Sequence, residues 1–289
     1  ESGSFQEQGL DLEMLFFDSA QPAAVEVASG DIDFGTVGMS ASFFVLAAQG
    51  QLKLIASSGG NAPGYFNLAF IASNKAWDDG LKSVANLKGH SIAISQVGTA
   101  LHYTVGEAAR YYGFSIDDVA VKPLQSTSNC LAAVTGSTVD ASVVPGVTVA
   151  GPVSRGEFHL LAWAGDIAPI PAGNAVFTST KHANEDGELV KRFLVAYRHG
   201  THDFADAFIG PDGKHRDSPD APAVLAIMSK FTGAPAATIA KTIAFVEPQS
   251  RIDKASIVDQ IAWYQSQNLL KANVSAHAII DMRYATLMP

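Results

Sequence analysis

The chain has 289 residues, 47% hydrophobic and 16% charged, which is long enough for one large domain or two medium domains that each bury a core. Its 28 acidic and 19 basic residues give a net charge of -9, which argues against a nucleic-acid surface because such surfaces need clustered Lys and Arg. The single cysteine, Cys130, excludes an internal disulfide and a multi-cysteine metal site.

Short apolar runs alternate with segments of helical spacing through the first two thirds of the chain. This alternation predicts βα units and a mainly parallel sheet. We expect strands at residues 10–17, 32–38, 52–58, 66–73, 90–95, 119–124, 139–145 and 158–165.

Helices are expected between these runs. After the stretch SQVGTALHY (95–103), apolar residues recur at i, i+4, i+7 and i+11, which predicts a helix that ends near Gly113. Shorter helical segments are expected at 22–29 and 128–135. From Asn184 onward there are several amphipathic segments and no strong strand candidate, so we expect a helical C-terminal third.

Two stretches of the chain are similar to each other. NLAFIASNKA (67–76) and NAVFTSTKHA (174–183) share an Asn, an apolar strand, a hydroxyl residue and a Lys. Two similar strands on either side of a complete α/β block are what a lobe inserted into another lobe would need. We therefore expect a discontinuous lobe I (1–73 and 181–289) and an inserted lobe II (74–180).

Six segments together suggest a family. In order and spacing they resemble the solute-binding subunits of ABC importers in the nitrate/taurine/sulfonate, NMT1/THI5-like group: GLDLEMLFF, ASGDIDFGTVGMSASFFVLAAQG, LKLIAS, SVANLKGHSIAISQVGTALHY, DDVAVKPL and VTGSTVDASVV. The resemblance implies a type II periplasmic binding protein. In this α/β fold, two lobes with helices on both faces of their sheets are joined by two crossing strands and hold a solute in the cleft between them.

The resemblance carries further expectations. The family places a first strand before the segment seen here at residues 3–10, and we expect that strand to be missing from this chain. The implied partners are a small-molecule solute and an ABC permease at the membrane. The implied location is periplasmic or otherwise extracytoplasmic, in a mature form without its signal peptide. No apolar stretch of membrane-spanning length occurs in the sequence.

Six loops would line the cleft, because ligands of open α/β sheets bind beyond the carboxyl ends of the strands. None of the loops at 36–42, 56–67, 95–104, 124–129, 143–148 and 165–174 contains Lys or Arg. Their backbone N–H groups, hydroxyls and helix N-termini can hold a small anion without a basic side chain. A neutral or planar ligand could equally lie against Tyr65 or Phe66.

The candidate ligand-binding residues are the polar, aromatic and close-approach positions of these loops. They are Gly38, Ser40, Ser42, Asn61, Tyr65, Phe66, Ser95, Gln96, Thr99, Ala100, His102, Ser126, Pro145 and Asn174. Most of them have a structural alternative. The hydroxyls could serve as helix caps, the glycine as turn geometry, the rings and Asn61 as core, and His102 as a neutral surface histidine.

Catalysis finds little support in the sequence. There is no dinucleotide fingerprint, no phosphate loop with its Lys and no Gly-x-Ser-x-Gly elbow. His199 and His202 fit a solvated helix face better than a metal site, and Cys130 fits a small buried residue. We expect no cofactor, no metal and no enzymatic activity. The alternative is an enzyme of related fold, either similar to those of thiamine-pyrimidine synthesis or a cofactor-free lyase that uses His102 or Asp166.

The solute class follows from what the loops lack. Many relatives place an acidic or aromatic residue after the strand at 139–145, where this chain has Val144, Pro145 and Gly146. Without that acid, a cationic solute is disfavoured. A small organic anion, such as a sulfonate or carboxylate, or a small aromatic solute is expected.

Overall fold

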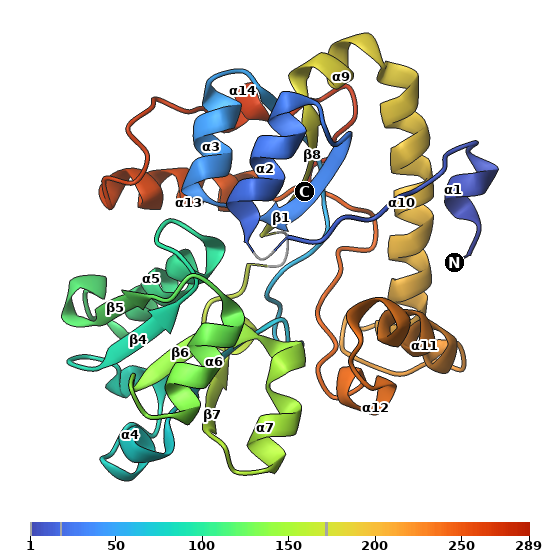
Figure 1. Ribbon diagram of the computed structural model, residues 1–289. Coiled ribbons are helices and arrows are strands. Elements are labelled where there is room, and N and C mark those ends of the chain that lie inside the picture. The colour runs from blue at the N-terminus through green and yellow to red at the C-terminus, as the bar shows by residue number, and fades with distance from the viewer. Residues whose placement is uncertain (1, 18, 171–172) are drawn as a thin grey trace. The chain divides into compact units, whose positions relative to one another are not determined.

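The computed structural model describes residues 2–17, 19–170 and 173–289. The chain divides into two compact units, each with its own sheet (Figure 1). Unit 1 comprises Glu1–Gly60, Pro171–Val224 and Val246–Pro289, and unit 2 comprises Asn61–Ile170 and Leu225–Phe245.

Unit 1 has three strands and a larger set of helices. The strands are β1 (Phe34–Gly38), β2 (Leu52–Ser57) and β8 (Asn174–Ser179). The helices are α1 (Ser4–Glu7), α2 (Ala20–Ser29), α3 (Ala41–Ala48), α9 (Thr180–Glu185), α10 (Gly187–Phe208), α13 (Lys254–Ser266) and α14 (Ala276–Ile279), while α11 (Ala221–Thr232) crosses the boundary between the units.

The sheet of unit 1 has the order β1-β8-β2. The central strand β8 is antiparallel to both neighbours, so β1 and β2 run in the same direction. The buried side chains of β8 explain its central place, since Phe177 is 0% exposed and meets the Phe43 ring of α3 edge-on at 5.2 Å.

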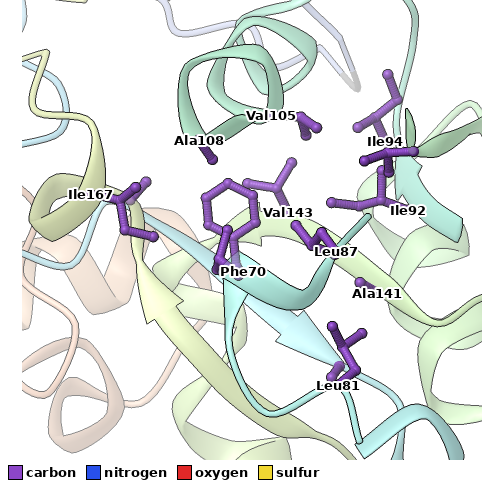
Figure 2. Close-up of a cluster of buried hydrophobic side chains, with 14 of the residues drawn as sticks. Phe70, Leu81, Leu87, Ile92, Ile94, Val105, Ala108, Ala141, Val143 and Ile167 are labelled. Atoms are coloured by element: carbon purple, nitrogen blue, oxygen red, sulfur yellow. The ribbon is translucent and has the colours of Figure 1, made fainter. Parts of the chain in front are cut away.

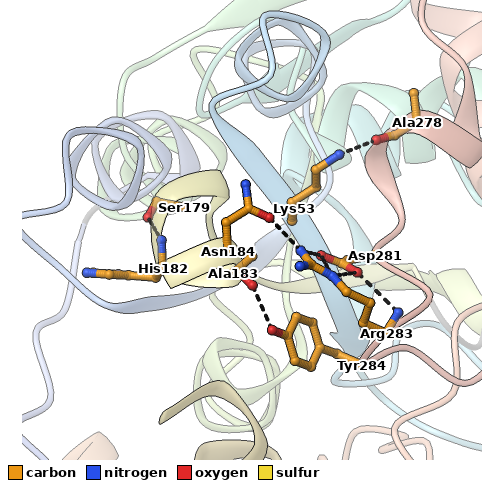
Figure 3. A network of polar contacts seen from close by, with 9 residues as sticks. All are labelled: Lys53, Ser179, His182, Ala183, Asn184, Ala278, Asp281, Arg283 and Tyr284. Atoms are coloured by element: carbon orange, nitrogen blue, oxygen red, sulfur yellow. Dashed lines mark hydrogen bonds and ion pairs between the residues drawn. The ribbon is translucent and has the colours of Figure 1, made fainter. Parts of the chain in front are cut away.

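A polar network joins the C-terminal tail to this sheet (Figure 3). The Lys53 ammonium on β2 donates to the Ala278 carbonyl at 2.7 Å, and the Tyr284 hydroxyl donates to the Ala183 carbonyl at 2.7 Å. Arg283 pairs with Asp281. Since the Asp281 N–H also donates to the Leu54 carbonyl, the tail covers the outer edge of β2.

Unit 2 is built on five strands: β3 (Leu68–Ala72), β4 (Ser91–Ile94), β5 (Ala120–Pro123), β6 (Ala141–Pro145) and β7 (His159–Trp163). Its helices are α4 (Asn74–Asp78), α5 (Ala100–Tyr112), α6 (Thr127–Thr135), α7 (Ala150–Ser154), α8 (Ala164–Ile167) and α12 (Ala236–Ile239), with short 3-10 turns η1 (Val84–Asn86), η2 (Ile116–Asp118) and η3 (Gly146–Thr148).

The sheet of unit 2 has the order β5-β4-β6-β3-β7. β4 is parallel to β5 and β6, while β3 is antiparallel to β6 and β7. Four strands therefore share one direction, as the mainly parallel prediction requires. Figure 2 shows the core on one face, where Phe70, Ile92 and Val143 of the sheet pack with Val105 and Ala108 of α5.

The strand and helix predictions are confirmed with one exception. The helix predicted after residues 95–103 is α5, and it ends at Gly113 in the left-handed conformation with φ 75°. The strand predicted at 10–17 is wrong, because these residues adopt no regular structure. An extended segment becomes a strand only when a neighbour takes its backbone hydrogen bonds, and 11–17 have no such neighbour among the described residues.

The chain passes from unit 1 to unit 2 before β3, and it returns to unit 1 before β8. The expected lobe boundaries at 73/74 and 180/181 lie after these strands. The difference arises because β3 hydrogen-bonds to β6 and β7, and β8 to β1 and β2. Residues 225–245, expected in lobe I, also pack in unit 2. Within the described ranges, every helix is too short or too polar to cross a bilayer.

Candidate functional site

Ten of the predicted residues come together at one end of the unit 2 sheet. The parallel strands β4, β5 and β6 end there, and β3 begins there because Leu68 pairs with Pro145. Two backbone bonds hold the loops after β4 and β5 side by side: the Leu124 N–H donates to the Ile94 carbonyl at 2.9 Å and the Gln125 N–H to the Ser95 carbonyl at 2.8 Å. The loops that lead into α5 and α6 therefore start beside each other.

The loop between β4 and α5 is shaped by its own side chains. Thr99 is the N-cap of α5 but makes no side-chain capping bond, because its hydroxyl donates to the Gln96 carbonyl at 2.8 Å. The first-turn N–H groups of α5, starting at Ala100, thus lack a side-chain cap. Thr99 therefore occupies the N-cap position, but its side chain does not play the capping role given above as its structural alternative.

His102 lies under this loop and is 7% exposed, so it is not a surface histidine. Its Nδ1 accepts the Gly98 N–H at 3.2 Å, which places the proton of the neutral imidazole on Nε2. Burial lowers its pKa from 6.5 to about 4. His102 is therefore neutral near pH 7 and fixes the direction of the Gly98 amide.

The loop before α6 contributes a cap and a strained residue. The Ser126 hydroxyl accepts the Asn129 N–H at 3.1 Å, which is the capping role expected as its alternative. Gln125 has a positive φ of 75°, which non-glycine residues seldom adopt outside special sites. Gln125 was not among the predicted residues, and no sequence signal marks a left-handed Gln.

The loop at 61–67 is held by backbone contacts on both sides. Asn61 exchanges N–H to carbonyl bonds with Ile170 at 2.9 and 2.7 Å, and its side-chain oxygen accepts from Asn67. Tyr65 is 1% exposed and packs edge-on against Phe245 at 5.1 Å, so its ring belongs to the core. Phe66 is partly exposed and packs on Trp163 at 4.9 Å.

Unit 1 brings the other four predicted residues together at the end of its sheet where β1 ends and β8 begins. Gly38 ends β1 directly opposite Asn174, the first residue of β8. Ser40 caps α3 by accepting the Phe43 N–H at 3.2 Å, and its hydroxyl lies 2.9 Å from that of Ser42. Residues 171 and 172 of the adjoining predicted loop lie outside the described residues.

A hydroxyl cluster in unit 1 was missed by the sequence reasoning. The Thr36 hydroxyl of β1 donates to the Ser58 hydroxyl at 3.4 Å, just beyond the end of β2. Burial raises the pKa of the Tyr197 phenol, which hydrogen-bonds to Ser58. The loop at 56–67 pointed to Ser58, but nothing in the sequence indicates that Tyr197 of α10 would reach it.

The predicted loops at these two sheet ends present mainly neutral hydrogen-bonding groups. The predicted loops contain no Lys or Arg, and Asp166 accepts the Gly64 N–H at 3.1 Å. Backbone N–H groups at the start of α5 and α6 favour negative charge through the helix dipole, which is equivalent to about half an elementary charge. No three His, Cys, Asp or Glu side chains in the described part of the chain gather as a metal site would require.

The sequence profile of the NMT1/THI5-like family matches residues 1–207 of this chain. The chain belongs to the NMT1/THI5-like family. The resemblance seen in the sequence is therefore confirmed. Among curated protein sequences there is no match to this chain.

Solved structures show that this NMT1/THI5-like chain has the fold of a periplasmic binding protein. The alkanesulfonate-binding protein SsuA from Xanthomonas axonopodis pv. citri bound to MOPS is 20% identical, with a TM-score of 0.74 over 96% of this chain and 91% of its own. The periplasmic aliphatic sulphonate binding protein SsuA from Escherichia coli is 18% identical, with a TM-score of 0.73 over 96% and 90%. The Candida albicans CA3427 product, described as having the generic periplasmic binding protein fold, is 14% identical, with a TM-score of 0.71 over 99% and 91%.

Proposed function

We propose that the chain is the extracytoplasmic solute-binding subunit of an ABC importer and that its solute is a small organic anion such as a sulfonate or carboxylate. The observation that carries this proposal is the pair of loops that lead into α5 and α6, which are joined by two backbone hydrogen bonds and contain no Lys or Arg. This arrangement suits an anion held by neutral donors. Membership of the NMT1/THI5-like family and the likeness to two sulfonate-binding proteins support it.

The proposed contacts are the fourteen residues predicted from the sequence, but the structure changes the role that we propose for some of them. Ala100 would offer a backbone N–H group, while the Gly98 N–H and the Thr99 hydroxyl would hold the loop in place through His102 and the Gln96 carbonyl. Tyr65 would act through the packing of its loop, since its ring is buried. Thr36 and Ser58 are added in unit 1, because their hydroxyls lie at the end of the sheet where Gly38 also lies.

We propose a binding role rather than an enzymatic one. The two groups named for acid-base chemistry are engaged in holding loops: His102 accepts from Gly98 and Asp166 accepts from Gly64. A permease at the membrane is the proposed partner, because a solute-binding subunit acts by passing its solute on. Hinge closure on the solute would then be the working step.

A thermal-shift panel tests the solute class. Saturating short alkanesulfonates or carboxylates should raise the melting temperature by several degrees, since a ligand at about 100 times its Kd adds about 2.7 kcal/mol. Aliphatic amines at the same concentration should leave the melting temperature unchanged. Stabilisation by amines alone would contradict the proposal.

Matched variants locate the binding in unit 2. Thr99→Val should weaken the best anion about two- to tenfold, because it removes the hydrogen bond to the Gln96 carbonyl that holds the loop before α5, and such a bond contributes about 0.5–1.5 kcal/mol. Thr138→Val is the control, since Thr138 is exposed and its hydroxyl bonds to the Ala133 carbonyl at the C-terminal end of α6. Equal affinity in both variants would remove Thr99 from the site.

A further inference from the structure

A strained turn joins β5 to α6 in unit 2. The Ser126 N–H donates to the Leu124 carbonyl at 3.0 Å, which closes a three-residue γ-turn with Gln125 at its centre. Gln125 has a φ of 75°, and γ-turns with a positive φ at the central residue are rare and strained. The turn follows the end of β5, at the end of the sheet where the predicted ligand-binding residues of unit 2 gather.

The surrounding hydrogen bonds hold this turn in its strained form. The Gln125 N–H donates to the Ser95 carbonyl at 2.8 Å, and the Leu124 N–H donates to the Ile94 carbonyl at 2.9 Å. The Asn129 side chain donates to the Leu124 carbonyl at 2.8 Å. Backbone strain persists only where the surrounding structure fixes it from several sides, and such positions are concentrated at functional sites.

The residue type at the centre of the turn is unusual as well. Four non-glycine residues in the described part of the chain have a positive φ, and the other three are Ser137, Ser250 and Asn268. Ser and Asn side chains are short enough to hydrogen-bond their own backbone in this conformation, whereas Gln is longer. Glycine would adopt a φ of 75° at no steric cost. A glutamine at this position therefore indicates a use for its side chain.

Two neighbouring side chains at this turn can reach a solute. Gln125 is exposed, while Ser95 is 7% exposed. Within residues 2–17, 19–170 and 173–289, neither the Gln125 carboxamide nor the Ser95 hydroxyl has a hydrogen-bond partner. The fully buried unpaired polar atoms of these residues do not include the Ser95 hydroxyl, so its oxygen is accessible. A bound solute would give both groups a partner.

We propose that Gln125 is a specificity-determining residue of the anion site, and that its carboxamide donates a hydrogen bond to the anionic group of the solute beside the Ser95 hydroxyl. This inference rests on the proposed function, since it requires an anion at the loops that lead into α5 and α6. A carboxamide suits this place because it donates to an anion without forming an ion pair. The strained turn fixes the backbone from which the side chain extends.

A glycine variant separates a contact with the solute from a structural role. Gln125→Gly should leave the melting temperature unchanged or raise it by about 2 °C, because glycine relieves the strain. In isothermal titration calorimetry it should weaken methanesulfonate binding about tenfold, because a hydrogen bond to a charged group is lost. Unchanged affinity, or a fall in both melting temperature and affinity, would overturn the proposal.

The matched control for this variant lies at the other end of α6. Ser137 follows the C-terminal end of α6 and has a φ of 54°. Ser137→Gly relieves strain of the same kind and should keep the affinity of the natural chain for methanesulfonate. An equal loss of affinity in Ser137→Gly and Gln125→Gly would trace the loss to unit 2 as a whole and refute a contact by Gln125.

A charge variant tests the contact independently. Gln125→Glu keeps the size and shape of the side chain but places a negative charge against the anion, so methanesulfonate binding should weaken about 100-fold. Thr138→Glu adds the same charge beyond the far end of α6, roughly 13 Å away, and should change the affinity less than about twofold because of screening. Equal effects of the two variants would overturn the proposal.

The natural chain distinguishes failure of this inference from failure of the proposed function. If the natural chain binds neither methanesulfonate nor acetate, the proposed function fails and the role of Gln125 fails with it. If the natural chain binds methanesulfonate and the Gly and Glu variants of Gln125 bind it equally well, only the role of Gln125 is refuted.

Discussion

Replacing Gly146 with Ala is expected to destabilise unit 2 by about 3 kcal/mol or more. A Cβ at this position would lie 1.7 Å from the Phe66 carbonyl oxygen and 3.0 Å from the Trp163 ring. The obstacle is backbone, which cannot turn aside as a flexible side chain can. The Gly146 N–H also donates to the Asn67 carbonyl at 2.7 Å, so relief of the clash would break the contact that holds the 61–67 loop.

A glycine elsewhere serves as the control for this variant. Gly200 lies within α10 and an added Cβ there would meet nothing within 4 Å. Gly200→Ala should therefore stabilise the chain by about 0.5–1 kcal/mol, because Ala is the better helix former. Urea unfolding followed by circular dichroism measures both changes. A loss below about 1 kcal/mol for Gly146→Ala would show that the 61–67 loop is not tightly packed against β6.

Acidification should destabilise the protein through His102. The folded protein keeps this imidazole neutral down to a pKa of about 4, whereas its ordinary pKa is 6.5. The unfolded chain therefore binds the proton first as the pH falls. The stabilisation is complete above pH 6.5 and is lost as the pH falls towards 4, a loss of about 2–3 kcal/mol after allowance for solvent screening.

The variant His102→Asn isolates this contribution. An Asn side chain can accept the Gly98 N–H but does not titrate, so the variant should lose less stability than the natural chain between pH 7 and pH 4.5. Carboxyl groups with lowered pKa, such as Asp140 and Asp118, contribute equally to both proteins. Urea unfolding across this range makes the comparison. Parallel pH profiles would show that His102 is not the group responsible.

Local pattern was sufficient where a segment finds its partner nearby. The apolar stripe of α5 predicts the helix because Val105 and Ala108 pack on the sheet that precedes and follows them in the chain. The same reasoning failed at 10–17, where the alternation is equally strand-like. Local pattern identifies a segment capable of pairing, but only a neighbouring strand makes it pair.

The sequence did not show which strand of each sheet runs antiparallel to the others. The two similar stretches at 67–76 and 174–183 contain β3 and β8, and each is the one antiparallel strand of its sheet. Their similarity indicated a repeated role. It could not indicate which sheet each strand joins, because that depends on hydrogen bonds to segments distant in the chain.

The sequence predicts at which strand ends the candidate residues lie, but not which contacts their side chains make. Loops at the strand ends were found because Gly, Ser and Asn mark the turns that precede helices. The burial of Tyr65 and His102, and the contact between Tyr197 and Ser58, depend on tertiary packing. No local signal carries that information.

Amide chemical shifts during titration with methanesulfonate test the central claim most directly. We predict saturable shifts in residues 98–102 and 126–129 of unit 2, where helix N-termini would meet the anion. Methylamine should leave the same amides unchanged. Absence of shifts there, or saturable shifts confined to other residues, would contradict the assignment of an anion-binding solute receptor.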